Sequence, residues 1–150
     1  MVRRLENGEE AIWRKLLIES VETHPECFIT TAEKMRAIPL SWFEHEIEQQ
    51  FVMTAGADEA FAVLELDSKG ARLHSMYVQP HARRKGLASE IIRHICTLAQ
   101  HKGIERVELG VLQDNVGAVT LYEKHGFKIE KTEPFGERID CQMAVYLNGS

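Results

Sequence analysis

The sequence predicts an α/β fold with a mixed, mostly antiparallel sheet of about six to seven strands, flanked by about four helices. Two observations support this prediction. Within the first fifty residues the apolar side chains recur at helical spacing, and after residue 50 they gather in short segments separated by turn residues. In the second half, segments with helical and strand patterns follow one another. This order is typical of helices packed on a sheet.

The chain has 150 residues, which predicts a single domain spanning residues 1–150. A content of 44% apolar and 27% charged residues excludes a disordered chain. The longest apolar run, residues 60–64, is far shorter than the roughly 18 residues of a membrane span, and no signal peptide is visible. The three cysteines are scattered without a Cys-x-x-Cys motif, so we expect a reduced, cytoplasmic protein.

Charge is unevenly distributed along the chain. Residues 1–75 carry 8 basic and 14 acidic side chains, whereas residues 76–150 carry 10 and 9, and the formal net charge is −5. The halves either face different partners or differ only in a Glu-rich, solvated helix surface. No extended basic face is visible, so we expect no nucleic-acid partner.

The first predicted elements are two helices. Residues 9–21 show a helical apolar period, and Pro25 predicts that this helix ends at His24. A second helix is expected at residues 42–50, with Ser41 as its N-cap.

An antiparallel meander follows, because the connections between its strands are too short for a crossover. Its predicted strands are residues 51–55, 60–66 and 72–78, with turns at 56–58 and 67–70. The remaining predicted elements are a long amphipathic helix from residue 87 towards Gly103, a strand at 107–112, a helix at 115–125, and strands at 127–131 and 139–147.

The segment from Val78 to Ala88 carries the first functional signal, because a strand runs into a basic loop that opens a helix. Unpaired N–H groups at a helix N-terminus, beside Arg83, Arg84 and Lys85, suit a phosphate or pyrophosphate. The spacing matches neither a Walker A loop nor the three-glycine dinucleotide motif. The alternative is a basic loop that caps an ordinary helix.

A second signal lies in the later helix. Asn115, Ala118 and Tyr122 follow i, i+3, i+7 spacing and so share one helix face. An amide and a phenol on one face can hydrogen-bond a ligand or transfer a proton. The alternative is a core Tyr whose hydroxyl is satisfied internally.

Together these segments resemble the GNAT superfamily of N-acetyltransferases. Arg83-x-x-Gly86-x-Ala88 is similar to the family's acyl-CoA signature, and Asn115-x-x-Ala118-x-x-Leu121-Tyr122-x-x-x-Gly126-Phe127 is similar to its later motif. The order of elements from Leu5 to Leu147 also fits, so the resemblance covers nearly the whole chain. It implies a GNAT-like fold with a central splay in the sheet.

The resemblance implies transfer of an acetyl group from acetyl-CoA, as co-substrate, to a primary amine by direct attack within a ternary complex. Pantetheine would lie where the strand through residues 76–78 separates from its neighbour, after Gly110 or Val111. The residues implied to bind acetyl-CoA are Met76, Tyr77, Val78, Arg83, Arg84, Lys85, Gly86, Leu87, Ala88, Ser89 and Asn115.

The resemblance also implies catalytic roles. A main-chain N–H near Tyr77 would stabilise the oxyanion, and Tyr122 would protonate the leaving thiolate as general acid. The general base stays open: His74 and Glu108 are the main candidates, and Glu65 is a third. Each of the three can equally be a solvated sheet residue.

The acceptor is expected to be a small-molecule amine, with a protein N-terminus or lysine as alternatives. In the family the acceptor pocket is partly built from the first two helices, so the acidic first half favours a cationic acceptor. We expect no metal, since His94 and His101 lack a third ligand, and no membrane partner. The chain is expected to be a monomer or homodimer. The alternative function is a non-catalytic acyl-CoA-binding or sensing module on the same fold.

Overall fold

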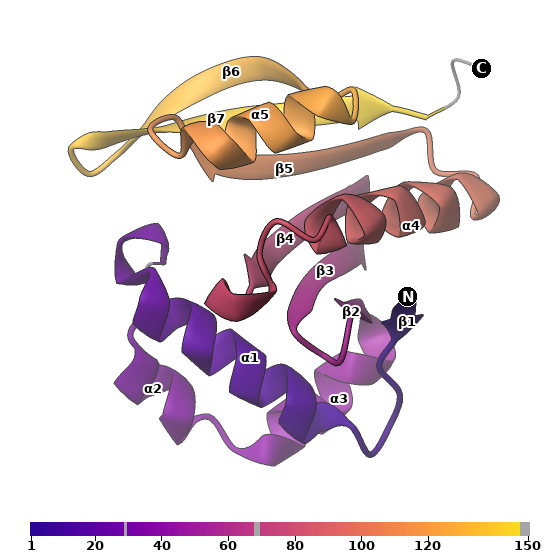
Figure 1. Ribbon diagram of the computed structural model, residues 1–150, viewed down its shortest axis with the longest axis vertical. Helices are drawn as coiled ribbons and strands as arrows, with labels where there is room; N and C mark the ends of the chain where they lie inside the picture. The colour runs from indigo at the N-terminus through magenta and orange to yellow at the C-terminus, as the bar shows by residue number, and fades with distance from the viewer. Residues whose placement is uncertain (29, 68–69, 148–150) are drawn as a thin grey trace. The chain divides into compact units, whose positions relative to one another are not determined.

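The computed structural model describes residues 1–28, 30–67 and 70–147 (Figure 1). The chain divides into two compact units. The first comprises Met1–Leu64 and Ser75–Ile91, and the second comprises Glu65–His74 and Ile92–Ser150.

The secondary structure confirms the predicted α/β fold with a mixed, mostly antiparallel sheet. Among the described residues the sheet has seven strands, in the order β1-β2-β3-β4-β5-β7-β6. The strands are β1 (Val2–Arg4), β2 (Phe51–Ala55), β3 (Ala60–Asp67), β4 (Gly70–Val78), β5 (Arg106–Leu112), β6 (Lys128–Phe135) and β7 (Arg138–Tyr146). The helices are α1 (Glu10–Thr23), α2 (Ala32–Ala37), α3 (Leu40–Gln49), α4 (Leu87–His101) and α5 (Val116–Lys124), with short 3₁₀ turns η1 (Pro25–Cys27) and η2 (Pro80–Ala82).

The first unit packs α1, α2 and α3 beside the first strands of the sheet (Figure 1). β1 and β3 both pair antiparallel with β2. Apolar side chains of α1, α3, β2 and β3 form its core, which includes Trp13, Leu16, Phe43, Ile47 and Phe61. The helical spacing of these residues therefore marks the faces that are buried, as the sequence predicts.

The ends of the first helices test the predicted caps. α1 ends at Thr23 with His24 as C-cap, so the predicted stop before Pro25 is confirmed. The predicted N-cap Ser41 is wrong, because α3 begins at Leu40 and Ser41 lies inside it. Pro39 is the N-cap instead, in extended backbone at φ −67° and ψ 150°, and its carbonyl accepts the N–H of Trp42 at 3.0 Å. Proline fixes φ near this value and so starts the helix directly after itself.

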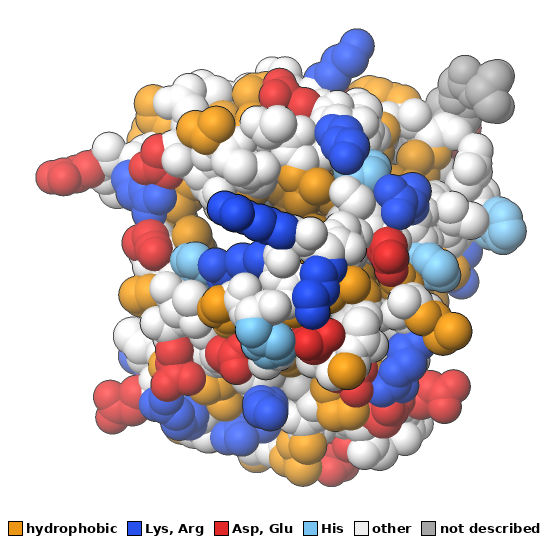
Figure 2. Space-filling view, in the orientation of Figure 1, with side chains coloured by type: hydrophobic (Ala, Val, Ile, Leu, Met, Phe, Trp, Pro, Cys, Tyr) orange, Lys and Arg blue, Asp and Glu red, His pale blue; other side chains and the backbone are white. Residues whose placement is uncertain are grey.

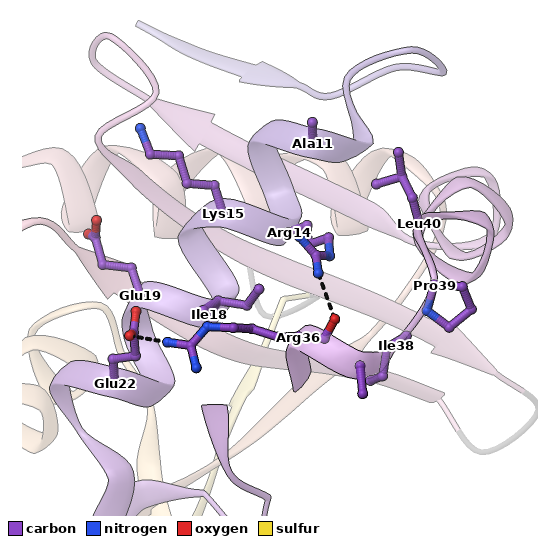
Figure 3. A pocket seen from close by; sticks show the side chains of 11 residues that line it. Ala11, Arg14, Lys15, Ile18, Glu19, Glu22, Arg36, Ile38, Pro39 and Leu40 are labelled. Carbon is purple, nitrogen blue, oxygen red and sulfur yellow. Dashed lines mark hydrogen bonds and ion pairs between the residues drawn. The ribbon is translucent and has the colours of Figure 1, made fainter. Parts of the chain in front are cut away.

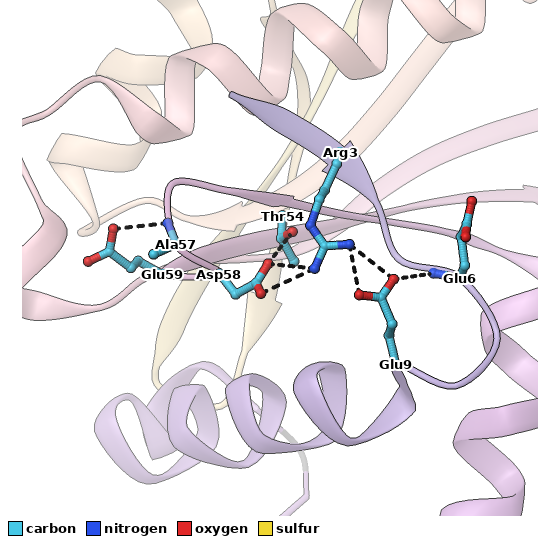
Figure 4. A network of polar contacts seen from close by, with 7 residues as sticks. All are labelled: Arg3, Glu6, Glu9, Thr54, Ala57, Asp58 and Glu59. Carbon is cyan, nitrogen blue, oxygen red and sulfur yellow. Dashed lines mark hydrogen bonds and ion pairs between the residues drawn. The ribbon is translucent and has the colours of Figure 1, made fainter.

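A polar network joins the edge strand β1 to the turn after β2 (Figure 4). Arg3 donates to both carboxylate oxygens of Asp58, each at 3.2 Å, and to Glu9 at 3.0 Å. Thr54 also donates to Asp58, at 2.9 Å. The N–H of Glu6 and the Arg3 guanidinium hold the pKa of Glu9 below its ordinary value. The network therefore attaches the three-residue β1 through side chains as well as through backbone pairing.

The second unit is built on β5 and β7. Arg106–Leu112 pairs antiparallel along its whole length with β7, and β6 pairs antiparallel on the other side of β7, with a register shift between Ile129 and Lys131. β4 runs parallel to β5, with Ala71 opposite Val107 and Arg72 opposite Glu108. α5 lies against β5 (Figure 1). The predicted turn at residues 67–70 includes Ser68 and Lys69, which lie outside the described residues.

No helix among the described residues is long and apolar enough to cross a membrane.

Candidate active site

The loop before α4 presents main-chain N–H groups. Arg84 and Gly86 both have positive φ, +66° and +78°. The first hydrogen bond of the helix runs from the Glu90 N–H to the Gly86 carbonyl at 3.0 Å, so the amides of Leu87 and Ala88 precede the helical ladder. Left-handed residues that alternate in a turn form a concavity of N–H groups that suits an anion. A Cβ at Gly86 would meet nothing within 4 Å, so a ligand can approach this backbone closely.

The three cationic side chains of this loop, Arg83, Arg84 and Lys85, differ in their contacts. Arg83 donates its Nε to the Val78 carbonyl at 3.0 Å and lies 3.5 Å from His24 Nε2, so it is directed back towards β4. Arg84 and Lys85 are exposed. Figure 2 shows Lys and Arg side chains gathered on the face where α4 begins. Arg84 and Lys85 are therefore better placed than Arg83 to meet an anionic ligand in solvent.

The end of β4 is fastened to α1 through Glu19. The buried Tyr77 donates its hydroxyl to Glu19 Oε2 at 2.8 Å, and Gln79 donates to Glu19 Oε1 at 3.2 Å. Burial raises the pKa of Tyr77. Ser75 has φ +64°, which is unusual for a non-glycine residue inside a strand. Sequence reasoning missed Glu19, because its partners are more than fifty residues away along the chain.

A pocket of about 710 Å³ lies between α1 and the segment from Arg36 to Leu40 (Figure 3). Arg14 donates to the Arg36 carbonyl at 2.8 Å, and Arg36 forms an ion pair with Glu22. The charged side chains that line it are Arg14, Lys15, Glu19, Glu22 and Arg36. Both signs of charge are present, so this lining is not the acidic wall that the composition of the first half suggests.

In the second unit, α5 carries Tyr122 of the later motif, and Asn115 directly precedes the helix. Asn115 is the N-cap of α5, and its Oδ1 accepts the Ala118 N–H at 3.3 Å. Tyr122 is only 7% exposed, and its ring packs edge-on against Phe127 at 5.8 Å. Burial raises the pKa of Tyr122 far above the physiological range, so its hydroxyl stays protonated. Sequence reasoning did not foresee that Asn115 also has this structural role.

The candidate bases differ in their surroundings. Burial, with the charge of Arg72, lowers the pKa of His74 to about 4. Glu108 accepts from Arg106 at 2.7 Å and from Arg72 at 3.3 Å, and these guanidinium groups lower the pKa of its carboxyl. His74 and Glu108 are therefore both unprotonated near neutral pH. Glu65 lies half-buried on β3.

A polar cluster that sequence reasoning missed surrounds Gly110 on β5. A Cβ at this position would lie 3.1 Å from Arg72 Nη2, 3.1 Å from Gln142 Nε2 and 3.3 Å from Asp140 Oδ2. Gln142 is directly opposite Gly110 in the β5–β7 register, and it donates to Asp140. A guanidinium, an amide and a carboxylate thus converge over one residue that has no side chain.

The described residues hold no group of three or more His, Cys, Asp or Glu side chains that could bind a metal ion. Burial raises the pKa of Cys96 to about 11 and also raises the pKa of Cys141. These two thiols are therefore poor nucleophiles at neutral pH.

Curated relatives share part of this chain. The uncharacterized N-acetyltransferase YsnE of Bacillus subtilis (strain 168) is 35% identical over 88 residues, which is 57% of each chain. The thialysine N-epsilon-acetyltransferase of Caenorhabditis elegans is 30% identical over 63% of this chain and 61% of its own. The [ribosomal protein bS18]-alanine N-acetyltransferase of Salmonella typhimurium is 28% identical over 63% and 68%. The chain spans about half to three fifths (48–61%) of the first relatives it matches.

Solved structures share the fold. A GNAT-family acetyltransferase from Streptococcus pneumoniae superposes with a TM-score of 0.84 at 20% identity, over 99% of both chains. YncA, a putative acetyltransferase from Salmonella typhimurium solved with its cofactor acetyl-CoA, gives a TM-score of 0.76 at 17% identity, over 100% of this chain and 95% of its own.

The sequence model of the acetyltransferase (GNAT) family matches residues 10–127, which include the loop before α4 and the whole of the later motif. This match confirms the family that the two motifs resemble. The chain belongs to the acetyltransferase (GNAT) family.

Proposed function

We propose that this chain is an N-acetyltransferase that moves an acetyl group from acetyl-CoA to a primary amine by direct attack within a ternary complex. The observation that carries the proposal is the loop before α4, where Arg84 and Gly86 have left-handed backbone directly before a helix N-terminus. The family match supports it, and so do the three curated relatives described above, each of which is named as an N-acetyltransferase.

The residues of this loop fit the diphosphate of acetyl-CoA. The N–H groups from Arg84 to Ser89 would hold it at the N-terminus of α4. Arg84 and Lys85 add exposed positive charge, and the open space at Gly86 allows close approach. Arg83 would support the loop through its bond to Val78. When bound, acetyl-CoA supplies a thioester carbonyl that is activated towards amines.

The chain's own residues would then act on the developing charges. We assign pantetheine recognition to the main chain of Met76, Tyr77 and Val78, where a main-chain N–H near Tyr77 would stabilise an oxyanion. The Glu19 carboxylate fixes this segment by accepting from Tyr77 and Gln79. Asn115 starts α5, the helix that carries Tyr122. The protonated Tyr122 hydroxyl would serve as general acid, and its raised pKa keeps that proton available.

We propose that a general base on the sheet removes the proton of the attacking amine. His74 and Glu108 remain the two candidates, because both are unprotonated near neutral pH. Neither is a strong base, since burial disfavours protonated His74 and two guanidinium groups disfavour protonated Glu108. Such a base is sufficient only where the amine already binds close to its neutral form.

The acceptor in this proposal is a small-molecule primary amine, while a protein N-terminus or lysine are outcomes that the test distinguishes. The relatives named for thialysine and for a ribosomal-protein alanine show that both kinds of acceptor occur among similar proteins. We further propose that the chain is a cytoplasmic protein. It would form one N-acetyltransferase domain and would be a monomer or a homodimer.

The test has two parts. Isothermal titration with acetyl-CoA measures binding, and free-thiol release across a panel of amines, amino acids and peptides measures transfer. The proposal predicts binding together with amine-dependent thiol release. Binding without release for every acceptor would replace the enzyme with an acyl-CoA-binding or sensing module. Absence of binding would contradict both functions.

A further inference from the structure

The pocket beside α1 has the size and lining of a small-molecule site. Its volume is about 710 Å³, and pockets for small organic ligands range from about 300 to about 1,000 Å³. One wall is α1, the other is the segment from Arg36 to Leu40, and both belong to the first unit (Figure 3). The pocket can bury an apolar ligand body, because the apolar residues of its lining are Ala11, Ile18, Ala37, Ile38, Pro39 and Leu40.

The carboxylates of this lining already have partners. Glu22 forms an ion pair with Arg36, so these two charges balance each other. Glu19 Oε2 accepts from the Tyr77 hydroxyl at 2.8 Å, and Glu19 Oε1 accepts from Gln79 at 3.2 Å. Both oxygens of Glu19 therefore bind groups at the end of β4. The two acidic side chains of the pocket are thus occupied by other groups of the chain.

Two cationic side chains of the lining have no carboxylate partner. Within the part of the chain that the structure describes, neither Arg14 nor Lys15 forms an ion pair. Arg14 donates Nη2 to the carbonyl of Arg36 at 2.8 Å, a neutral acceptor that does not balance its charge (Figure 3). Its Nε is buried and has no acceptor among the described residues, so the guanidinium lacks part of its usual hydrogen bonding. The lining has three cationic and two anionic side chains, which leaves a net positive charge.

We propose that this pocket binds an organic anion with an apolar body, such as a medium-chain carboxylate. The guanidinium of Arg14 and the ammonium of Lys15 bind the anionic group through charge-assisted hydrogen bonds. The apolar body lies against the wall that contains Ile18, Ile38 and Leu40. Such a ligand carries no amine, so it is not an acceptor, and the site goes beyond the proposed acetyl transfer.

Ligands with the same chain and different head groups test the charge of the site. Octanoate, octan-1-ol and octylammonium carry a negative, a neutral and a positive head, and titration calorimetry measures the Kd of each. Octanoate should bind about tenfold or more tightly than the other two, because only its head can form a hydrogen bond between opposite charges. Equal affinity of the alcohol would overturn the proposal. Tighter binding of octylammonium would also overturn it, since Glu19 and Glu22 would then be the anchors.

Chain length tests the apolar wall. Butanoate keeps the carboxylate on a shorter chain and should bind about tenfold or more weakly than octanoate, because it buries less apolar surface. Equal affinity of butanoate and octanoate would contradict a site that recognises an apolar body.

Substitutions in the pocket test the two anchors. Lys15→Gln changes an exposed side chain, so it should leave the fold intact and weaken octanoate binding about threefold. Arg14→Gln should weaken octanoate binding about tenfold, because the guanidinium is less exposed than the Lys15 ammonium. The matched control is Lys34→Gln, at an exposed position of α2 outside the pocket lining, which should leave the Kd unchanged. Equal losses in Lys34→Gln and Lys15→Gln would show a general charge effect and contradict the assignment.

Methyl resonances show where the ligand binds. ¹H–¹³C NMR follows the isoleucine methyl groups of the full chain while octanoate is added. Ile18 and Ile38 line the pocket and should shift, whereas the exposed Ile129 on β6 should not. The titration is repeated with Arg14→Gln and Arg84→Gln. Binding that is lost in Arg84→Gln and kept in Arg14→Gln would place the anion at the loop before α4 and overturn the proposal.

Octanoate binding and acetyl transfer are measured separately, so the two proposals can fail separately. Shifts at Ile18 and Ile38 support the pocket even if the chain acetylates no amine. Acetyl transfer without these shifts would support the enzyme and overturn the pocket ligand.

Discussion

Replacing His74 with Gln should make the protein less sensitive to acid. His74 is half-buried on β4, where burial and the charge of Arg72 lower its pKa from 6.5 to about 4. In the unfolded chain the ordinary pKa applies, so between about pH 4 and pH 6.5 the unfolded state binds more protons than the folded state. The free energy of unfolding therefore falls as the pH decreases through this window.

The size of the effect follows from the two pKa values. One pKa unit corresponds to about 1.4 kcal/mol, so the difference between 6.5 and about 4 corresponds to roughly 3 kcal/mol as an upper bound. Partial exposure of the imidazole reduces this figure. Above about pH 7 the histidine is neutral in both states and contributes no pH dependence.

The assay is urea denaturation of the wild type and His74→Gln at several pH values between 4 and 8. The difference in unfolding free energy between the two proteins should change by about 1 to 3 kcal/mol across this range, in favour of the variant at low pH. His94→Gln, at an exposed position on α4, is the control. A difference that stays constant with pH would refute the burial of a neutral His74.

Further substitutions test the candidate site and the fold. Tyr122→Phe should lower kcat about tenfold or more and leave the Kd of acetyl-CoA unchanged, and an unchanged kcat with rate-limiting chemistry would remove Tyr122 as general acid. Gly86→Ala should weaken acetyl-CoA binding, because φ +78° strains an L-residue. The control is Gly103→Ala, which imposes similar strain at φ +75° and should leave the Kd of acetyl-CoA unchanged. Equal weakening of acetyl-CoA binding in both variants would refute the loop assignment. Thr31→Ala removes the acceptor of the Lys34 N–H and should cost about 1 kcal/mol in denaturation, while an unchanged midpoint would contradict the cap.

The elements that sequence reasoning missed are the short ones. α2 has six residues, too few to show a helical period, although Thr31 and Glu33 are typical of a helix start. β1 has three residues, and its pairing with β2 joins positions about fifty residues apart. The longer elements have repeating apolar faces, so their existence could be predicted from local pattern alone.

The candidate site also has parts that a local sequence pattern predicts and parts that depend on pairing between distant segments. The loop before α4 and the face of α5 are continuous segments, so the spacing of Gly86 and Tyr122 within their motifs was sufficient to find them. The cluster over Gly110 depends on the register between β5 and β7 and on the parallel pairing of β4. No local signal connects Arg72 with Asp140, and a glycine inside a strand is informative only once its neighbours are known.

The contact of Glu19 with both Tyr77 and Gln79 has a consequence for laboratory evolution. Glu19 also lines the pocket beside α1, so one side chain belongs to two surfaces. Libraries that diversify this pocket can vary Ala11 and Lys15, which are exposed, without touching the end of β4. Substitution of Glu19 instead removes the hydrogen bonds that it accepts from Tyr77 and Gln79. A Glu19 substitution selected for a new pocket would therefore also alter the end of β4.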